Sequence, residues 1–355
     1  MDDNEQRRIA RQLNLPGWSL DVQQKLADAH VLVIGAGGLG CPAMQGLAAA
    51  GIGHITLIDD DTVDITNIQR QILFGASDVG RPKVEVAAGR LRELQPSIIV
   101  TTVQERLTTA NALDLVAGAD IVLDGSDTFA TKYLVADACE ITATPLVWAT
   151  VLRFSGQVAL WHSGPGLDTP SLRDLFPEQP SGDSVPDCAT AGVLGVTTAV
   201  IGNLMATDAI KYLTGLGVSQ PGRVLSYDAL AGSTRALTVA RAPSRPLVTQ
   251  LSTYEEACGT SANEGLLGEV SSGAAVALDI REPHEYLLGD IPAGGDLRKL
   301  PLSAIDSPRD VAEALEGAHR VVVYCASGVR SAAFAEKYSD LGFDLVSLPG
   351  GVNGV

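Results

Sequence analysis

The sequence predicts an α/β protein in two parts: a larger domain built on a mostly parallel sheet, then a smaller α/β domain. Between about residues 30 and 245, apolar runs rich in β-branched residues alternate with longer alanine-rich stretches, as strands and crossover helices do. A stretch with two prolines and several small polar residues begins near residue 241 and indicates a linker. Strand-like and helix-like runs then resume. With 355 residues, the chain is long enough for two domains.

Individual apolar runs place the predicted elements and boundaries. We predict strands at 30–35, 54–59 and 120–124 in the first part, and at 274–280 and 320–325 in the second. A helix is expected to begin near Ser331. The predicted boundaries are a first domain over 1–245, a linker over 246–265 and a second domain over 266–355.

Composition excludes several classes of protein. Hydrophobic residues make up 46% and charged residues 19%, which argues against wholesale disorder. With 42 acidic and 25 basic residues, the net charge of -17 argues against nucleic acid or an anionic membrane as main partner. The five cysteines form no CxxC pair, and the sequence has neither a secretory signal nor a membrane-spanning stretch. We therefore expect a reducing, cytoplasmic location.

A glycine-rich turn follows the first predicted strand and indicates a nucleotide site. Its GxGxxG glycines are Gly35, Gly37, Gly38 and Gly40, and the helix that follows would direct free amides at an anion. Asp59 ends the next strand about 20 residues later, where a carboxylate can accept hydrogen bonds from ribose hydroxyls. These two features alone fit a nicotinamide-dependent dehydrogenase equally well.

Further polar residues favour a triphosphate. Asn67 and Arg70 follow the acidic turn, and Lys83 opens the next helix, so both cations are expected near the same crevice. Taken singly, each could instead be a solvated surface charge. Asp127, in the DGSD segment after a later strand, could hold Mg²⁺ together with phosphate oxygens, or it could cap a helix.

In this order and spacing, GAGGLG, DDDTVDITNIQRQ, GRPK and DGSD resemble the molybdopterin-synthase and thiamine sulfur-carrier adenylyltransferases, relatives of ubiquitin-activating enzymes. The resemblance implies a Rossmann-like adenylation domain in which the glycine loop and Asp59 hold the nucleoside of ATP. It also implies that Asn67, Arg70 and Lys83 hold the phosphates and that Asp127 holds Mg²⁺. The implied reaction is attack of a carrier's C-terminal carboxylate on the α-phosphorus of ATP, with release of pyrophosphate.

The same resemblance covers about residues 5–245 and implies a homodimer, in which Arg11 reaches into the partner's site. The implied protein partner is a ubiquitin-like sulfur carrier that ends in Gly-Gly.

Two departures from this family stand out. Thr128 follows Asp127 where the family often has asparagine. Many members bind zinc through two CxxC pairs, but the matching positions here are Ser171, Asp174, Arg245 and Val248. Without these thiolates a four-cysteine zinc site cannot form, and we predict no zinc.

Cys188 lies in a stretch rich in glycine, proline and serine that indicates a loop. Such a cysteine could be a small buried hydrophobe. The resemblance instead implies a part in acyl or persulfide transfer.

Cys325 ends an apolar strand and begins a short loop before a helix, Cys325-Ala326-Ser327-Gly328-Val329-Arg330. Loop amides and Arg330 would stabilise a thiolate or persulfide there. Four residues separate the cysteine from the arginine, whereas cysteine-type phosphatases use five, so the smaller loop favours sulfur.

With ALDIREPHEYLLGDIP upstream, residues 266–355 resemble a rhodanese domain. The resemblance implies that Cys325 carries a persulfide, supplied by a donor such as a cysteine desulfurase or thiosulfate. Asp279 and Arg281 match a pair that we interpret as structural.

The leading hypothesis is an enzyme that adenylylates a sulfur carrier with ATP and then converts its C-terminus to a thiocarboxylate. Tethering the two sites in one chain would raise their effective concentration. Three alternatives stay open at this point: adenylation of another carboxylate or of a modified tRNA base with a vestigial rhodanese domain, a nonenzymatic scaffold, and a dehydrogenase.

Overall fold

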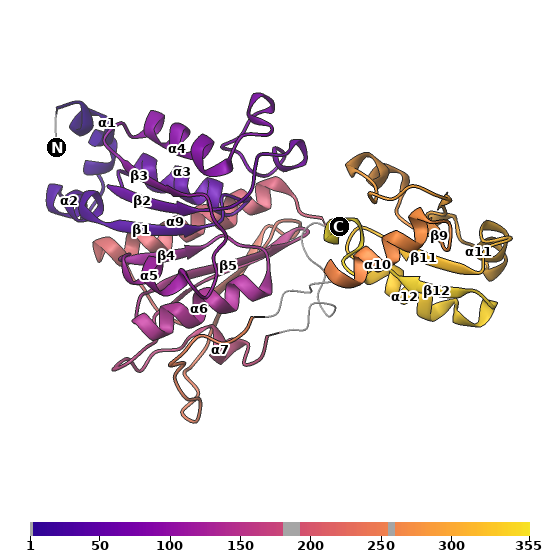
Figure 1. The fold of residues 1–355 in the computed structure, drawn as a ribbon. Helices are drawn as coiled ribbons and strands as arrows, with labels where there is room; N and C mark the ends of the chain where they lie inside the picture. The colour runs from indigo at the N-terminus through magenta and orange to yellow at the C-terminus, as the bar shows by residue number, and fades with distance from the viewer. Residues whose placement is uncertain (1–2, 180–191, 255–259) are drawn as a thin grey trace. The chain divides into compact units, whose positions relative to one another are not determined.

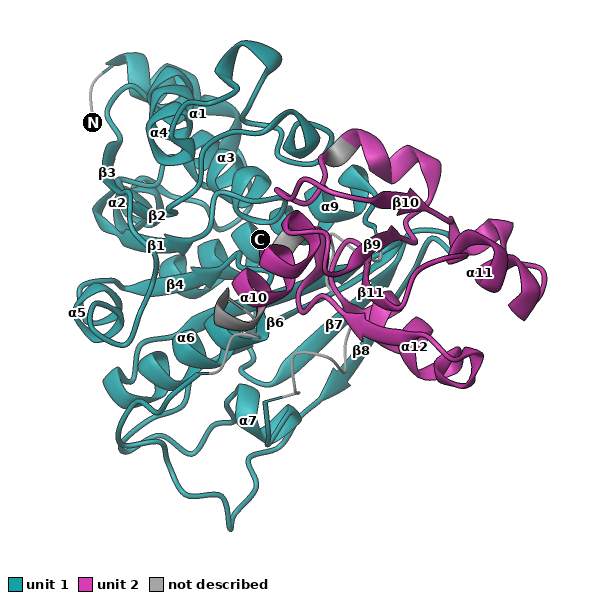
Figure 2. Cartoon of the chain, turned by 45° about the vertical axis from the view of Figure 1, so that its right-hand side comes forward, with its two compact units in different colours: residues 1–180, 192–254 teal, residues 181–191, 255–355 magenta. Residues whose placement is uncertain are grey.

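The structure is a computed structural model that describes residues 3–179, 192–254 and 260–355. These residues form two compact units, shown in different colours in Figure 2. Unit 1 includes 3–179 and 192–254, and unit 2 includes 260–355. Among the described helices, none is long and apolar enough to cross a bilayer.

Unit 1 is built on one eight-stranded sheet with the order β3-β2-β1-β4-β5-β6-β7-β8. The first five strands in this order are parallel and the last three are antiparallel, which confirms the predicted α/β class. The strands are β1 (His30–Ile34), β2 (His54–Ile58), β3 (Ile99–Val103), β4 (Ile121–Asp124), β5 (Leu146–Leu152), β6 (Ser155–Trp161), β7 (Arg223–Asp228) and β8 (Ser233–Thr238).

Helices cover both faces of the parallel part of this sheet, and Figure 1 shows α3 and α4 on one side with α5 and α6 on the other. This explains why β1 is apolar without alternation: Val31, Leu32, Val33 and Ile34 are at most 3% exposed. The helices of unit 1 are α1 (Asp3–Leu13), α2 (Leu20–Asp28), α3 (Gly40–Ala50), α4 (Lys83–Leu94), α5 (Ala112–Ala117), α6 (Phe129–Thr142), α7 (Leu172–Leu175) and α9 (Gly195–Thr214).

The long helix α9 packs closely on α3, which brings its N-terminal half beside the glycine-rich turn. At Gly202, a Cβ atom would lie 2.5 Å from both the Leu39 carbonyl oxygen and Pro42 Cγ, so only glycine permits this approach. At Gly195, a Cβ atom would lie 2.1 Å from the Gln69 carbonyl oxygen. The segment that contains Arg70 is therefore held against the start of α9.

Unit 2 contains a four-stranded parallel sheet with the order β10-β9-β11-β12. Side chains of β11 alternate between two cores: Val321 and Val323 pack with Phe334 of α12, and Val322 and Tyr324 pack on the opposite face. The elements are α10 (Thr260–Ser271), β9 (Val276–Asp279), the 3₁₀ helix η3 (Pro283–Leu288), β10 (Leu297–Lys299), α11 (Pro308–Ala314), β11 (Arg320–Tyr324), α12 (Val329–Lys337) and β12 (Asp344–Ser347).

Helix α12 begins at Val329, two residues before Ser331, so the helix expected to begin near Ser331 is present; Gly328 takes a left-handed conformation (φ 87°) that turns the chain into it. Residues 246–254 fold with unit 1, and α10 already begins at Thr260, so both ends of the expected linker 246–265 are structured.

Candidate functional site

The glycine-rich turn joins the carboxyl end of β1 to α3. Gly35 has a left-handed backbone (φ 86°), and a Cβ atom on Gly40 would lie 1.9 Å from the Gly35 carbonyl oxygen. A Cβ atom on Gly35 would lie 3.2 Å from the carbonyl oxygen of Gly125, which follows β4. Two loops thus meet at the carboxyl ends of neighbouring strands, the place where ligands of such sheets bind.

Asp59 follows β2 at the same edge and holds the turn in place. Its carboxylate oxygens accept hydrogen bonds from the amides of Ala36 (2.7 Å) and Asp61 (2.9 Å). Burial raises the pKa of Asp59, and the neighbouring Lys83 opposes this shift. Each carboxylate oxygen has a second lone pair, so Asp59 can still accept a ribose hydroxyl.

Two cations border this turn. Lys83 is only 4% exposed, and its Nζ lies 2.7 Å from Asp61 Oδ2, so its alternative interpretation as a solvated surface charge is wrong. Arg70 is half-buried; a Cβ atom on Gly38 would lie 3.3 Å from Arg70 Cγ, which places this side chain against the turn.

Asn67 lies in the 3₁₀ turn that precedes Arg70. Its Oδ1 accepts a hydrogen bond from the Asp64 amide (3.3 Å) in a capping box, and the Arg70 Nη1 donates to the Thr66 carbonyl (3.1 Å). The side chain of Asn67 therefore organises the turn in this structure.

Asp127 is exposed in the loop after β4 and is not the helix cap. The N-cap of α6 is Thr128, whose Oγ1 accepts from the Thr131 amide (3.2 Å), so the departure from asparagine provides a cap. Within the described residues, the Asp127 carboxylate has no hydrogen-bond or ion-pair partner. An exposed, unpaired carboxylate beside the glycine turn fits a metal ion that carries phosphate oxygens.

Lys132 was missed by sequence reasoning. It is 4% exposed on α6, and its Nζ donates to the carbonyls of Ser126 and Ala149 (2.7 Å each) and to Asp124 Oδ2 (3.3 Å). This lysine fastens the loop that presents Asp127. The sequence signal that could have indicated this role is a lysine in the first turn of the helix that follows DGSD.

Arg11 lies exposed in the last turn of α1. Within the described part of the chain it makes no hydrogen bond or ion pair.

The cysteines differ in their surroundings. Cys41 and Cys139 are buried, and burial raises the pKa of Cys41 to about 12 and that of Cys139 well above its ordinary value. Neither thiol ionises readily, so both are core residues. Cys188 lies outside the described residues.

Cys325 follows β11 and lies in a compact loop at the N-terminus of α12. Its Sγ accepts a hydrogen bond from the Gly328 amide (3.1 Å) and lies 3.6 Å from Ser331 Oγ. The C-terminal turn supports the loop from outside: the Val352 amide donates to the Cys325 carbonyl (2.9 Å), and a Cβ atom on Gly351 would lie 2.2 Å from that same oxygen. The sulfur thus faces one backbone amide at the start of a helix, with a serine hydroxyl beside it.

The predicted structural pair in this unit is confirmed. Arg281 is 1% exposed, and its Nε and Nη2 donate to Asp279 (2.9 and 2.7 Å). Arg281 Nη1 also donates to the Gly289 carbonyl (2.8 Å), which fastens the segment after β9.

The sequence model of the ThiF family matches residues 9–247, which include the glycine turn, Asp59, Lys83 and Asp127. The chain belongs to the ThiF family. The model of the rhodanese-like domain matches residues 263–355, which include Cys325.

One curated relative matches nearly the whole chain, and two others match about seven tenths of it. This ThiF-family chain is 41% identical to the probable adenylyltransferase/sulfurtransferase MoeZ of Mycobacterium tuberculosis, over 97% of this chain and 91% of that protein. It is 45% identical to the adenylyltransferase and sulfurtransferase MOCS3 of Bos taurus, over 73% of this chain and 58% of the relative. It is 44% identical to the sulfur carrier protein adenylyltransferase of Thermus thermophilus, over 71% of this chain and 96% of that protein.

Solved structures agree on the fold. A crystal structure of E. coli MccB matches with a TM-score of 0.61, over 70% of this chain and 76% of the MccB chain. Because the identity is 22%, this likeness shows the fold alone.

Ser171, Asp174, Arg245 and Val248, the positions that the sequence resemblance placed at zinc cysteines, lie together around the arginine. Arg245 donates to Glu140 (2.7 and 3.0 Å) and to Asp174 (2.9 and 3.1 Å). The amide of Ser171 donates to Asp174 and that of Val248 donates to Glu140. An ionic cluster thus fastens the segment around Arg245 to α6 and α7.

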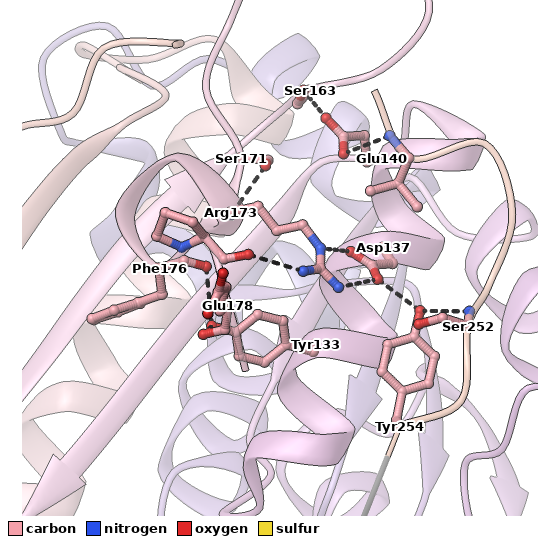
Figure 3. A network of polar contacts seen from close by, with 12 residues as sticks. Tyr133, Asp137, Glu140, Ser163, Ser171, Arg173, Phe176, Glu178, Ser252 and Tyr254 are labelled. Atoms are coloured by element: carbon pink, nitrogen blue, oxygen red, sulfur yellow. Dashed lines mark hydrogen bonds and ion pairs between the residues drawn. The ribbon is translucent and has the colours of Figure 1, made fainter. Parts of the chain in front are cut away.

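A second group of polar contacts, around Asp137, extends this attachment, and Figure 3 shows it together with Glu140. Asp137 of α6 accepts hydrogen bonds from Arg173 Nε (2.6 Å) and from the Tyr254 hydroxyl (2.7 Å). Burial and the hydrogen bond to Asp137 raise the pKa of Tyr254 to about 12, so its hydroxyl stays a donor at neutral pH. The chain is therefore anchored to unit 1 as far as Tyr254.

We expect Arg245→Met to lower the free energy of unfolding of unit 1 by about 3 kcal/mol at neutral pH. The side chains of Glu140 and Asp174 are 1% and 0% exposed, so the substitution leaves two buried carboxylates without their partner. Urea unfolding followed by the fluorescence of Trp148 and Trp161, which lie in unit 1, measures the change.

The pH dependence and a control test the cause. Burial opposes ionisation of both carboxylates, but hydrogen bonds, chiefly those from Arg245, bring the net pKa of Glu140 and Asp174 below their ordinary values. The two ionised carboxylates therefore contribute to the free energy of unfolding at pH values above their ordinary pKa values, and this contribution is lost as the pH falls. The difference in unfolding free energy between variant and wild type should shrink in acid. Arg90→Met, at a partly exposed arginine, should cost under about 1 kcal/mol. Equal costs for the two variants would contradict the prediction.

Proposed function

We propose that this chain uses ATP to adenylylate the C-terminal glycine of a ubiquitin-like sulfur carrier ending in Gly-Gly, and then transfers sulfur from Cys325 to form a thiocarboxylate. One observation carries the proposal: the glycine turn, Asp59, Arg70 and Lys83 meet at one edge of the sheet in a chain that also holds Cys325 in a donor-lined loop. Relatives named as adenylyltransferases and sulfurtransferases support both halves.

The adenylylation step needs positioning and charge neutralisation. Asp59 and the glycine turn hold the nucleoside, while Asn67, Arg70 and Lys83 hold the phosphates. A carboxylate oxygen of the carrier attacks the α-phosphorus, and the bond from that phosphorus to the pyrophosphate oxygen breaks. Bound Mg²⁺, held by Asp127, would neutralise phosphate charge. Fixed cations that face the developing charge lower the barrier without reorganisation.

The sulfur step uses the persulfide on Cys325. Its terminal sulfur attacks the carrier's acyl adenylate, a carbon–sulfur bond forms, and AMP leaves. The product is an acyl disulfide between carrier and Cys325. A second thiol, for which we propose Cys188, then attacks Cys325 sulfur, forms a disulfide with it and releases the thiocarboxylate.

The proposal includes an assembly and a location. The chain acts as a homodimer in which the exposed Arg11 of one protomer completes the ATP site of the other. The sulfur donor is a cysteine desulfurase or thiosulfate. The free thiols of Cys41, Cys139 and Cys325 suit a reducing cytoplasm.

We further propose that the protein holds no zinc. The ionic cluster around Arg245 places a guanidinium, which has no lone pair for a metal, where ligands would be needed, and the carboxylates of Glu140 and Asp174 are already bound to it. Elemental analysis of the purified chain should give well under one zinc per chain, and a chelator should leave its thermal unfolding unchanged. One tightly bound zinc per chain would overturn this.

Reconstitution tests the function. The full chain is incubated with ATP, Mg²⁺, a persulfide donor and a Gly-Gly-tailed carrier, and pyrophosphate release and the intact mass of the carrier are measured. We expect pyrophosphate only with carrier and Mg²⁺ present, and a carrier in which one oxygen is replaced by sulfur. If neither pyrophosphate nor a sulfur-containing carrier forms, the proposal is refuted. Pyrophosphate release without a change in the mass of the carrier would point to another carboxylate as the substrate.

A further inference from the structure

Arg330, the last residue of the loop Cys325–Arg330 (the sulfur loop), forms an ion pair with Glu285. Both terminal nitrogens of Arg330 donate to Glu285, Nη1 to Oε2 at 2.8 Å and Nη2 to Oε1. Such a two-pronged pair is stronger and more directional than a single contact. The pair lowers the pKa of Glu285 and raises that of Arg330, so both groups are ionised at neutral pH. Their charges cancel beside Cys325.

Glu285 is held in place by the fold. Its Oε2 also accepts a hydrogen bond from the Glu282 amide (2.8 Å), which closes a capping box at the start of η3. Its backbone carbonyl accepts from the buried Arg281 (3.4 Å), which is itself fixed by Asp279. The side chain of Glu285 is 14% exposed. Because its turn is fastened to β9, Glu285 cannot move away from Arg330 without disturbing the unit.

The loop retains donors but little net charge. Arg330 Nε and Ser327 Oγ are buried and donate no hydrogen bond among the described residues, the Arg330 guanidinium interacts electrostatically with Cys325, and the Gly328 amide faces Cys325 Sγ. Unpaired buried donors await an acceptor, and a single sulfur atom is one. A dianion would place two negative charges beside the Cys325 sulfur. The positive charge of Arg330 would not offset them, because Glu285 already balances it.

We infer that Glu285 sets the donor specificity of Cys325: by cancelling the charge of Arg330, it directs the loop to a thiol persulfide and disfavours the thiosulfate dianion. The inference rests on the proposed role of Cys325 as sulfur carrier. With the favoured donor, the Cys325 thiolate attacks the outer sulfur of R–S–S⁻, the S–S bond of the donor breaks, and Cys325–S–S⁻ and R–S⁻ form. With thiosulfate, the same attack would expel sulfite.

Glu285→Gln provides the main test in the full-length chain. We expect kcat/KM for sulfur transfer from thiosulfate to cyanide to rise about tenfold, because the freed charge of Arg330 acts on a dianion. Transfer from the persulfide of N-acetylcysteine methylamide, which carries at most one charge, should change less than about threefold. The ratio of the two rates is the readout, since a merely structural loss would lower both together.

A matched control removes the same charge elsewhere in the unit. Asp344 also pairs with an arginine, Arg320, but at the start of β12, the opposite end of the strands from Cys325. Asp344→Asn should leave the ratio unchanged. Equal changes in both variants, or a fall in both rates of Glu285→Gln, would overturn the inference.

A measurement on the wild-type chain avoids dependence on folding of the variant. Iodoacetamide alkylation of Cys325 is followed by mass spectrometry with and without millimolar sulfate. A loop without net positive charge should show no protection, and strong protection would overturn the inference. Transfer from thiosulfate as fast as from the persulfide would overturn only this inference. Transfer from neither donor would also refute the proposed function.

Discussion

Replacing Cys325 with serine should lower sulfur transfer to the carrier at least about 10³-fold and leave adenylylation nearly unchanged. Serine occupies almost the same volume, but its hydroxyl is far weaker as a nucleophile and cannot carry a persulfide. The Gly328 amide that faces Sγ would still find an oxygen acceptor, so the loop should keep its shape. Thiocarboxylate formation, read from the intact mass of the carrier, measures the loss.

The same sample provides an internal control. Cys325 lies in unit 2, whereas the glycine turn, Asp59 and Lys83 lie in unit 1, so ATP–pyrophosphate exchange should stay within about twofold of wild type. Unchanged thiocarboxylate formation would show that sulfur reaches the carrier without Cys325. A parallel loss of exchange would show instead that the substitution acts on the whole chain.

Lys83→Gln should lower kcat/KM for carrier-dependent ATP–pyrophosphate exchange by about 10²- to 10³-fold. The Nζ of Lys83 is a fixed cation at the edge of the sheet where we propose that ATP binds. Removing one preorganised group that stabilises the charge developing in a transition state typically lowers the rate by this factor. Its partner Asp61 has a side chain that is 65% exposed, so water can solvate the carboxylate that is left. Stability should therefore fall much less than activity.

A second lysine–aspartate pair makes the comparison clean. Lys211 pairs with Asp208 at 2.8 Å within α9, one turn apart and half-exposed. Lys211→Gln should leave exchange within about twofold of wild type and stability within about 0.5 kcal/mol. Sulfur transfer from Cys325 to cyanide should be unaffected in both variants. Full exchange activity of Lys83→Gln would remove this residue from the phosphate site.

The meeting of the glycine turn and Asp59 at one edge of the sheet could be predicted because each of these parts is local in sequence. A turn such as Gly35 to Gly40 has steric demands that only glycine meets, and Asp59 follows its strand directly. Parallel strands bring their carboxyl ends to one edge, so loops after consecutive strands meet without further information. The same holds for Cys325 and Arg330, which share one short loop.

Some side-chain roles were less accessible from spacing. The sequence pattern offered Asp127 as a possible helix cap, but the structure gives this role to Thr128, whose backbone is extended and whose hydroxyl accepts from the Thr131 amide. The place of Lys132 after DGSD does not by itself reveal its role, which follows from three oxygen acceptors that β4, β5 and the loop bring within reach. Such roles depend on which atoms surround a side chain in the folded protein. Sequence periodicity predicts the face of a helix or strand on which a residue lies, but not these neighbours.

The sequence by itself determined the α/β class, the order of the two units, the glycine turn with Asp59, and the sulfur loop of Cys325. These features rest on short-range geometry and on apolar periodicity, which are written in adjacent residues. Only the tertiary structure decided that Glu285 neutralises Arg330 and that Arg245 joins Glu140, 105 residues away. Those pairs form because packed helices and strands bring distant segments within hydrogen-bond distance, and any of many carboxylates in the sequence could have served as the partner.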